Sequence, residues 1–333
     1  MEFGSVKVRA ALGAVLAHSV VLPEGRLRKG RVIQVDDVAA LVAAGIDRVT
    51  VARLGPQDMG EDEAAKTLAR ALIDGQSGLR LSKPFTGRCN IIADGIGLAH
   101  LDVARLEEVN AVDEMVTLAT VPPWQRMAEG GMVGTVKVIS YGVAADSVTR
   151  AAEAGRGAIT LTPVVMETAA LIVTSHDAGS SEETGKGFKA IESRLNGLGM
   201  RLDAVEQVPH DSGSISEAVG RARADMVLIL TASATSDPAD VGPEALRMAG
   251  GTLTRFGMPV DPGNLLFYGA LSDGRPVIGL PGCARSPALN GADWVLERIA
   301  AGHPPTPDDI TKMGVGGLLK EIPTRKQPRQ PKG

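Results

Sequence analysis

The chain has 333 residues, a formal net charge of −4, 44% hydrophobic residues and 3% aromatic residues. This length favours two domains, and the acidic balance with so few aromatic side chains argues against nucleic-acid binding, which needs a basic face or stacking platforms. The sequence shows no apolar leader and no run of about 18 apolar residues, so we expect neither secretion nor a membrane span. The two cysteines, Cys89 and Cys283, have no metal-ligand spacing, which indicates a reduced, cytoplasmic protein.

Residues 1–160 show a mixed pattern of short apolar runs and amphipathic stretches. Strands are predicted at 31–35, 47–54, 88–93 and 135–141. Helices are predicted at 61–73, 101–110 and 147–154, with a shorter one capped by Asp36 and ended by Gly45. We therefore expect a mixed α/β region that forms one body or two small lobes.

Residues 165–302 show a regular alternation of strands and helices. Strands are predicted at 169–174, 202–208 and 225–231, and a hairpin joins 264–271 to 276–280. Helices are predicted at 186–198, at 215–222 capped by Ser214, at 243–249, and at 287–300 capped by Ser286. This alternation predicts a doubly wound, mostly parallel, three-layer α/β sheet with helices on both faces. Residues 303–333 are expected to be a C-terminal extension; its last part, 320–333, is either a flexible terminus or a functional basic tail.

In an open parallel sheet, ligands bind beyond the carboxyl ends of the strands. The first loop expected there begins at Thr174 and Ser175 and runs through small residues to 187. Its glycines let a ligand approach the backbone, the next helix offers N–H groups to an anion, and Lys186 adds a positive charge. The alternative is an ordinary solvated surface loop.

The second loop, 231–240, carries the hydroxyls of Thr231, Ser233 and Thr235, which suit a polar ligand. Asp237 and Asp240 follow, and their carboxylates are the ligands that Mg²⁺ prefers. The alternative is that Asp240 only caps the next helix.

The third loop, 280–287, has the composition of a strand-to-helix turn and contains Gly282, Cys283, Arg285 and Ser286. Helix-terminal N–H groups beside an arginine form a phosphate site, whereas the alternative is a tight turn with a solvated arginine. We expect Pro262, Gly263 and Asn264 to contribute a fourth edge.

Other candidates for a site are weaker. The histidines show no metal-ligand spacing, and His210 with Asp211 reads as a polar turn at another strand end. Cys283 has no base beside it in sequence, so a nucleophilic role is unsupported. The segment from Gly95 to Gly97 lacks the third glycine of a dinucleotide fingerprint.

The C-terminal half resembles the molybdopterin-binding domain of molybdopterin adenylyltransferases, MoeA-type molybdenum insertases and CinA-like proteins. The resemblance lies in the hydroxyl-rich loop 231–240 that ends in Asp, in Pro-Gly-Asn-Leu at 262–265, and in Gly-Leu-Pro-Gly-Cys-Ala-Arg-Ser at 279–286. The chain is still more similar to the family in which such a domain precedes a MocA-like cytidylyltransferase. That similarity rests on Phe-Gly-Met-Pro-Val-Asp-Pro-Gly-Asn-Leu-Leu at 256–266, Pro-Gly-Cys-Ala-Arg-Ser-Pro at 281–287 and Met-Gly-Val-Gly-Gly-Leu-Leu at 313–319, with N-terminal motifs at 16–19, 60–65 and 135–139.

Several positions depart from the family pattern. Ala232 and Ser233 replace a Gly-Gly pair, Cys283 replaces an Asn, and Asn264 replaces a Lys. A Gly-Asp-Glu motif is replaced by Ser-His-Asp at 175–177. These changes argue against molybdate insertion and adenylylation and leave pterin binding as an expectation. The nucleotidyltransferase segment of the fused family does not occur in these 333 residues, so we expect a stand-alone relative or a shortened fusion protein.

The resemblance implies a factor of molybdenum cofactor biosynthesis that takes molybdopterin or the finished cofactor as its ligand. Ser286 and Arg285 would hold the pterin phosphate, with Ser233, Thr235 and Asp240 at the pterin or at a metal ion. One role is to present the pterin to a MocA-like cytidylyltransferase, with the N-terminal region as a homo-oligomer contact or a cover. The alternatives are a transferase that inserts molybdate, a CinA-like nucleotide pyrophosphatase with Asp237 and Asp240 as a catalytic metal pair, and a protein that binds no small molecule.

Overall fold

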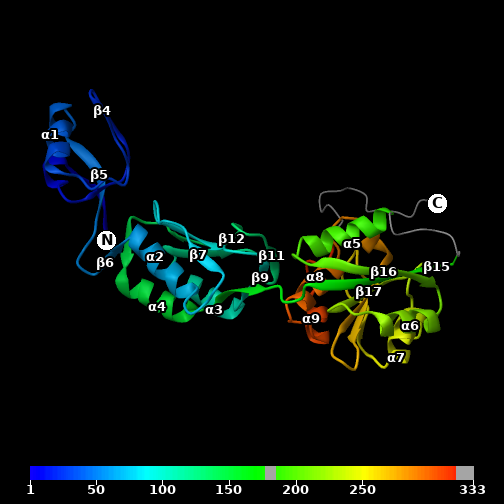
Figure 1. The fold of residues 1–333 in the computed structure, drawn as a ribbon. Coiled ribbons are helices and arrows are strands. Elements are labelled where there is room, and N and C mark those ends of the chain that lie inside the picture. Colours follow the sequence, from blue (N-terminus) through cyan, green and yellow to red (C-terminus); the bar gives the residue numbers. More distant parts are fainter. Residues whose placement is uncertain (177–184, 320–333) are drawn as a thin grey trace, which may run out of the picture. The chain divides into compact units, whose positions relative to one another are not determined.

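The computed structural model describes residues 1–176 and 185–319, which fall into two compact units, Met1–Thr162 and Pro163–Gly333 (Figure 1). Each unit has a hydrophobic core of its own. The expected mixed α/β region followed by a mostly parallel α/β domain is confirmed. In the described part of the chain, no helix has the length and apolar character needed to cross a membrane.

The N-terminal unit begins with an antiparallel sheet of strand order β1-β5-β2. Along β5 the side chains alternate, so that Val49 and Val51 are buried in one core with Leu41 of helix α1. The elements of this part are β1 (Glu2–Lys7), η1 (Val8–Ala10), β2 (Val15–Leu16), β3 (Val20–Leu22), β4 (Gly25–Leu27), α1 (Val35–Ala43) and β5 (Arg48–Arg53).

The strand predicted at 31–35 is wrong. Val32 makes only a single bridge with Val15, and α1 already begins at Val35. The N-cap of α1 is Gln34 rather than Asp36, because Gln34 and Asp37 form a reciprocal capping box. The Asp37 carboxylate accepts a hydrogen bond from the Gln34 backbone N–H over 2.9 Å, so the helix starts earlier than an Asp36 cap would allow.

The rest of this unit is built on the antiparallel sheet β10-β12-β8-β7, against which helix α2 packs. The helical spacing of Ala64, Leu68 and Leu72 buries these side chains in one cluster with Ile91 and Val136. The elements are β6 (Asp58–Gly60), α2 (Glu61–Leu72), β7 (Leu79–Leu81), β8 (Arg88–Ala93), β9 (Gly97–Leu101), α3 (Val103–Val112), β10 (Val116–Thr120), β11 (Gln125–Met127), β12 (Met132–Val138), β13 (Gly142–Ala144), α4 (Ala145–Gly155) and β14 (Ile159–Pro163).

The C-terminal unit is a six-stranded sheet of order β16-β15-β17-β20-β19-β18. The first four strands are parallel, and β19 and β18 each run antiparallel to the strand before them in that order. The strands are β15 (Thr168–Ser175), β16 (Arg201–Pro209), β17 (Met226–Leu230), β18 (Thr252–Phe256), β19 (Phe267–Ala270) and β20 (Pro276–Leu280). The helices are α5 (Lys186–Asn196), α6 (Ser212–Arg221), α7 (Val241–Met248), η2 (Gly282–Arg285), α8 (Gly291–Ala300) and α9 (Pro307–Lys312).

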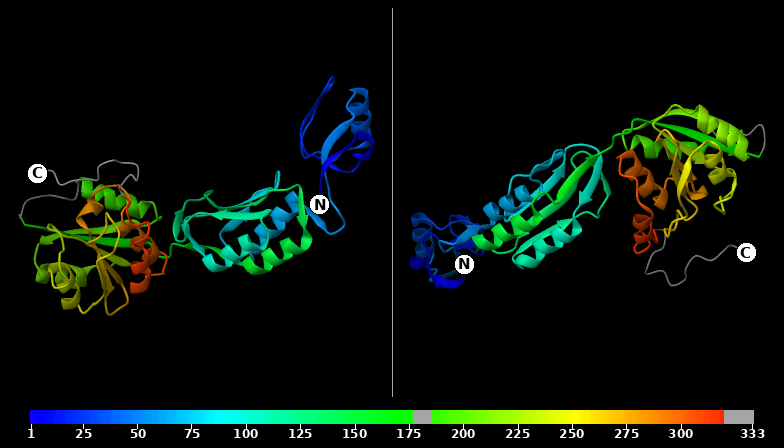
Figure 2. Two further views of the ribbon diagram at one scale, coloured as in Figure 1. Left: turned by 180° about the vertical axis from the view of Figure 1, so that it is seen from behind. Right: turned by 90° about the horizontal axis from the view of Figure 1, so that it is seen from below.

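Both faces of this sheet are covered by helices. Successive residues of β17 point to opposite faces, so that Leu228 packs with α5 and α8 while Val227 and Ile229 pack with α6 and α7. Figure 1 shows α5 on one side of the sheet and α6 and α7 on the other, and Figure 2 gives two further views. The predicted three-layer, doubly wound arrangement is therefore confirmed.

Two predicted helix caps of the C-terminal unit are wrong. Asp211, not Ser214, caps α6, because its carboxylate accepts the Ser214 N–H over 2.9 Å and so starts the helix at Ser212. The last long helix does not begin after Ser286. Residues Gly282–Arg285 form a separate short turn, and Asn290 caps α8 by accepting the Ala292 N–H over 2.8 Å.

The first part of the C-terminal extension packs on the same unit. Ile310 of α9 is fully buried in the core shared with α8. Asp261 N donates to Gly317 O over 2.9 Å, and Leu319 N donates to Asp261 O over 2.8 Å. Residues 320–333, expected to be a flexible terminus or a functional basic tail, and most of the first predicted loop, 177–184, lie outside the described residues.

Candidate functional site

The candidate site lies where the strand order of the C-terminal sheet reverses. The chain passes from β15 outward to β16 and then to β17 on the other side of β15. At such a point the connections leave a parallel sheet in opposite directions and open a crevice beyond the carboxyl ends. The segments that follow β15, β16, β17 and β20 all begin at this edge, because these strands are parallel. The predicted convergence of the loops therefore has a topological basis.

A histidine joins the ends of the first three strands. Nδ1 of His210, just after β16, lies 2.8 Å from Oγ1 of Thr174 in β15. Its Nε2 lies 2.8 Å from Oγ of Ser233, in the loop after β17. Thr174 Oγ1 also accepts the Ala232 N–H over 2.7 Å. Two predicted site residues, Thr174 and Ser233, are thus linked by a residue that the sequence suggested only as part of a polar turn.

The surroundings of the His210 ring lower its pKa. Partial burial lowers the pKa of His210, and the neighbouring His176 lowers it further. The rings of His176 and His210 meet edge to face with centroids 4.7 Å apart. Asp240 and Asp211 act in the opposite direction and raise the pKa, but the net shift is downward.

The other hydroxyls of the second loop are used in part to shape it. Thr231 and Thr235 are buried, and their Oγ1 atoms lie 3.3 Å apart. Thr231 Oγ1 donates to the carbonyl oxygen of Ser233 over 2.7 Å, which folds the loop back on the end of β17. Ser233 itself is exposed, whereas Thr231 and Thr235 are buried.

Arg285 brings the third loop to the second. Its Nη2 donates to the carbonyl oxygen of Thr231 over 3.0 Å. A Cβ atom on Gly187, in the first turn of α5, would lie 3.0 Å from Arg285 Cγ, so the arginine stem also runs against the start of that helix. A Cβ on Gly282 would lie 3.9 Å from Arg285 Nη1, so this residue is beside the guanidinium. Gly282 is exposed and Cys283 is half-buried. Parts of all three predicted loops therefore meet around Arg285.

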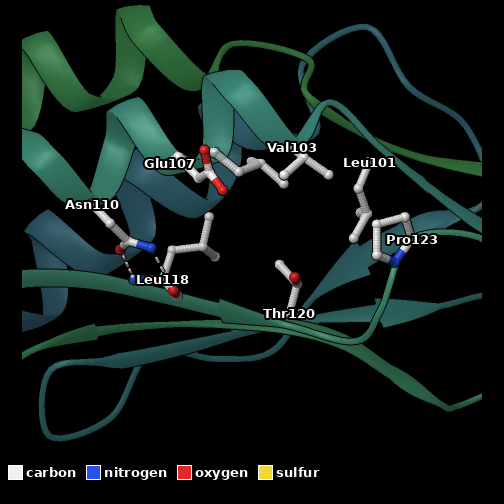
Figure 3. A pocket seen from close by; sticks show the side chains of 8 residues that line it. Leu101, Val103, Glu107, Asn110, Leu118, Thr120 and Pro123 are labelled. Carbon is white, nitrogen blue, oxygen red and sulfur yellow. Dashed lines mark hydrogen bonds between the residues drawn. The ribbon is translucent and has the colours of Figure 1, made fainter. Parts of the chain in front are cut away.

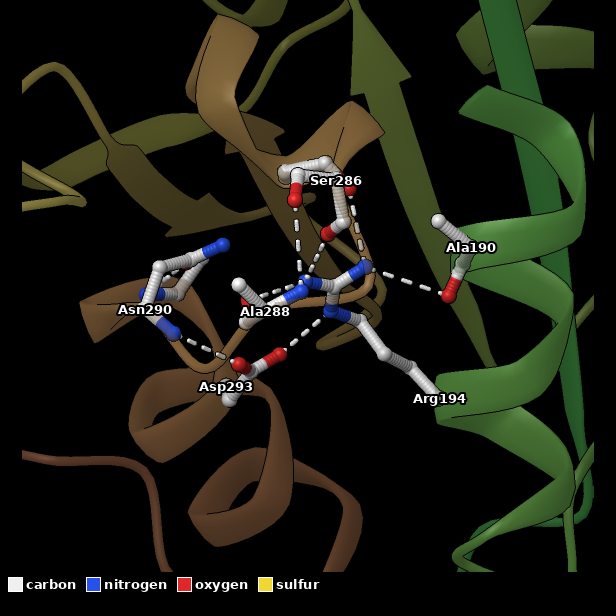
Figure 4. Close-up of polar contacts among 8 residues, drawn as sticks. Ala190, Arg194, Ser286, Ala288, Asn290 and Asp293 are labelled. Atoms are coloured by element: carbon white, nitrogen blue, oxygen red, sulfur yellow. Dashed lines mark hydrogen bonds and ion pairs between the residues drawn. The ribbon is translucent and has the colours of Figure 1, made fainter. Parts of the chain in front are cut away.

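A buried arginine on α5 holds the third loop in place. Arg194 donates to the carbonyl oxygens of Ala284 and Ser286, both over 2.8 Å, and forms an ion pair with Asp293 of α8 (Figure 4). The side chains of Arg194 and Asp293 each keep only 10% of their exposure. A charged anchor of this kind fixes a turn that has few backbone hydrogen bonds of its own. The Ser286 hydroxyl is half-buried and accepts the Ala288 N–H over 3.3 Å.

The carboxylates predicted as magnesium ligands bind backbone amides. Asp240 is the N-cap of α7, and its two oxygens accept the N–H groups of Val241 and Ser236 over 2.8 and 2.9 Å. Asp237 is exposed and accepts the Ala239 N–H over 2.7 Å. Within residues 1–176 and 185–319, no group of three or more His, Cys, Asp or Glu side chains has the geometry to hold a metal ion. The helix-capping alternative therefore describes Asp240 in this structure, and a magnesium ion stays a prediction.

The fourth predicted edge contacts α8. The N–H of Gly291 donates to the carbonyl oxygen of Pro262 over 2.8 Å. A Cβ on Gly263 would lie 2.7 Å from the Gly291 nitrogen, so this close backbone approach requires glycine. Asn264 is exposed, and its carbonyl oxygen accepts the Met258 N–H over 3.1 Å. Among the described contacts, this segment is tied to α8 rather than to the network around His210.

The N-terminal unit contains a shallow apolar groove of about 200 Å³ between α3 and β10 (Figure 3). Leu101, Val103 and Pro123 supply much of its lining. Asn110 lies at its end, but its side-chain amide is paired with the backbone of Leu118 over 3.0 and 2.8 Å. None of the predicted site residues lies in this unit.

Comparison with protein families gave matches to two parts of the chain. Residues 170–301 match the family described as a probable molybdopterin binding domain, and residues 5–53 match a domain of unknown function. The first match runs from β15 to the end of α8 and includes the whole candidate site. The C-terminal unit therefore contains a domain of the molybdopterin-binding type. Comparison with curated protein sequences gave no match.

Three solved structures are similar to the chain at low identity. A molybdopterin biosynthesis MoeA protein from Pyrococcus horikosii is 12% identical with a TM-score of 0.33, over 91% of this chain and 75% of that one. A molybdenum cofactor biosynthesis protein B is 17% identical with a TM-score of 0.31, over 42% of this chain and 96% of that one. A molybdenum cofactor biosynthesis protein from Pyrococcus furiosus is 13% identical with a TM-score of 0.22, over 97% of this chain and 66% of that one.

Proposed function

We propose that the C-terminal unit binds molybdopterin or the molybdenum cofactor at the carboxyl edge of β15, β16, β17 and β20, as a step of molybdenum cofactor biosynthesis. One observation carries the proposal. Thr174, His210 and Ser233 come from three strand ends and meet at the switch point of a domain that matches the molybdopterin-binding family.

The chemistry of the edge suits a phosphorylated pterin. Arg285 brings a positive charge to the point where three loops meet, and Gly282 beside it leaves the backbone accessible to a phosphate. The exposed Ser233 hydroxyl offers a hydrogen bond to a polar ring or side chain. We assign the phosphate to the Arg285 side of the site, with Ser286 beside it, and the pterin to the side of Ser233, Thr235 and Asp240.

We favour a role in binding and presenting the pterin over one in catalysis. Both oxygens of Asp240 accept backbone N–H groups, and Asp237 accepts another, so the carboxylates are engaged in loop and helix structure. A magnesium ion would have to compete with these hydrogen bonds. In this proposal the recipient of the pterin is a MocA-like cytidylyltransferase, and the N-terminal region supplies a homo-oligomer contact.

Anaerobic calorimetry of the full chain with molybdopterin tests the proposal. We expect saturable binding, with weaker binding of a pterin that lacks the phosphate. Parallel incubation with ADP-ribose and Mg²⁺ tests the pyrophosphatase alternative. Rapid hydrolysis of ADP-ribose together with absence of molybdopterin binding would overturn the proposal in favour of that alternative. Formation of molybdenum cofactor from bound molybdopterin and molybdate would instead assign the transferase role.

A further inference from the structure

The bridge between Thr174, His210 and Ser233 restricts where its protons can lie. Thr174 is 2% exposed, and in the described residues its Oγ1 has two hydrogen-bond partners, the Ala232 N–H and Nδ1 of His210. The Ala232 N–H can only donate, so Thr174 Oγ1 accepts this bond. A threonine hydroxyl has one proton to donate, and a neutral imidazole has one donor and one acceptor nitrogen. Only two arrangements of the ring proton are then possible.

The two arrangements differ in whether a buried hydroxyl is satisfied. If Nδ1 carries the ring proton, it donates to Thr174 Oγ1, and the Thr174 proton has no acceptor among the described residues. Leaving a buried donor without a partner costs about 1–3 kcal/mol. If Nε2 carries the proton, the Thr174 hydroxyl donates to Nδ1. The buried hydroxyl and both ring nitrogens then each have a hydrogen-bond partner. The geometry therefore selects the tautomer protonated at Nε2.

This tautomer determines what Ser233 can do. Nε2–H donates to Ser233 Oγ over 2.8 Å, so the serine oxygen is an acceptor within the bridge. The serine proton then points away from the histidine, and Ser233 is exposed at the candidate site. We infer that His210 is a positioning residue that holds the Ser233 hydroxyl as a hydrogen-bond donor toward an oxygen acceptor of the bound pterin. This inference rests on the proposed function.

The two carboxylates near the ring favour its cationic form, but burial and the neighbouring imidazole outweigh them, and the pKa of His210 is lowered. His176 stacks edge to face on His210, and Asp211 and Asp240 are the carboxylates that act on it electrostatically. A cationic ring would donate from both nitrogens and would again leave the Thr174 proton without an acceptor. The partly buried ring and the neighbouring imidazole both disfavour that state.

The tautomer is measured by long-range proton–nitrogen NMR of the histidine rings in the full chain without ligand. We expect the His210 signals of the tautomer protonated at Nε2 near neutral pH, and loss of that preference in Thr174→Val, which removes the donor to Nδ1. His18, exposed in the N-terminal unit, is the reference ring. Signals of a His210 ring protonated at Nδ1 would overturn the inference.

Molybdopterin titration by anaerobic calorimetry tests the link to the ligand. Ser233→Ala and His210→Leu should each weaken binding about tenfold, the effect of one lost hydrogen bond to a charged or polar ligand. His210→Gln should bind more tightly than His210→Leu, because a glutamine amide supplies an N–H near the position of Nε2. Ser236→Ala, in the same exposed loop, is the matched control and should bind as the wild type does. Thermal unfolding checks that each variant is folded. If His210→Leu does not fold, the result for Ser233→Ala, at an exposed position, decides the test.

The outcomes separate the two proposals. If the wild type binds molybdopterin and both Ser233→Ala and His210→Leu bind equally well, the inference is wrong and the proposed function stands. If the wild type itself does not bind molybdopterin, the proposed function fails and the inference fails with it.

Discussion

Arg285 Nη2 donates a hydrogen bond to the carbonyl oxygen of Thr231 over 3.0 Å, and this contact joins the turn after β20 to the end of β17. The two segments are about fifty residues apart in sequence, yet β17 and β20 are neighbours in the parallel sheet. The pairing of the strands therefore brings the two loops together, and the arginine fixes their spacing. Arg285 thus combines a structural contact with a charge at the candidate site.

The buried ion pair of Arg194 and Asp293 should be a major determinant of stability. Arg194→Met leaves the Asp293 carboxylate buried without its partner, which typically costs about 3–5 kcal/mol. Urea unfolding should show a loss of this order, together with weaker pterin binding because the Ala284–Ser286 turn loses its anchor. Arg201→Met is the control, because its pair with Asp203 spans 3.5 Å and is exposed, so stability should barely change. Equal stability of the two variants would contradict the anchoring role.

Gly279 of β20 faces Phe267 of β19 and should not tolerate a side chain. The two residues are register partners in neighbouring strands. A Cβ at Gly279 would therefore lie 1.8 Å from Phe267 Cε1. We expect Gly279→Ala to lower the free energy of unfolding by about 1–3 kcal/mol or more. In a double-mutant cycle, the loss should shrink in the Phe267→Leu background. Gly220→Ala, where a Cβ meets nothing within 4 Å, should be neutral or stabilising.

His210 should make stability depend on pH. Because its pKa is lowered in the folded protein, the unfolded chain binds more protons as pH falls through the ordinary histidine pKa of about 6.5. Its contribution is present above that pH and is lost as pH falls toward the lowered pKa. Urea unfolding between about pH 7.5 and about pH 5 should show decreasing stability, and His210→Gln should flatten part of the slope. The same slope in His210→Gln as in the wild type would contradict the expected effect.

Two variants of Asp240 distinguish its role in helix capping from its proposed role in pterin binding. Asp240→Ala removes the N-cap of α7 and should cost about 1 kcal/mol. Asp240→Asn keeps one of the two acceptor oxygens and should cost less. We expect both variants to stay folded and to bind molybdopterin more weakly, because both lose the carboxylate charge at the pterin side. Calorimetric titration with and without Mg²⁺ measures the affinity of each variant for molybdopterin. Asp240→Asn with full affinity in both conditions would restrict Asp240 to helix capping.

The layers of the C-terminal unit could be predicted because its central strands are continuous apolar runs. Residues 226–230 are all buried, as expected of a strand covered on both faces, and flanking helices carry regular apolar spacing. The position of the loops then followed from parallel pairing, since all parallel strands end at one edge. This reasoning places Thr174, Thr231, Ser233 and Arg285 at the same edge, and they lie within one contact network.

Long-range pairings explain what could not be predicted. The importance of His210 depends on β16 lying beside β15, and no local pattern gives that strand order. Arg194 reads as one more charged residue on a helix until its carbonyl partners are known. Ser286 has the local features of a helix cap, but Asn290 supplies the cap because Asp293 completes its capping box. In the N-terminal unit, short strands distributed over several sheets left no regular period to predict the topology.

The central claim is that an anionic pterin is held at the shared carboxyl edge around Arg285. The most direct measurement is anaerobic calorimetric titration of molybdopterin into the wild type, Arg285→Ala and Arg201→Ala, with folding checked by thermal unfolding. Arg201 begins β16 and so lies at the opposite end of the sheet. We predict saturable binding to the wild type and to Arg201→Ala, and at least about tenfold weaker binding to Arg285→Ala. Equal affinity in all three proteins, or no binding to the wild type, would contradict the account.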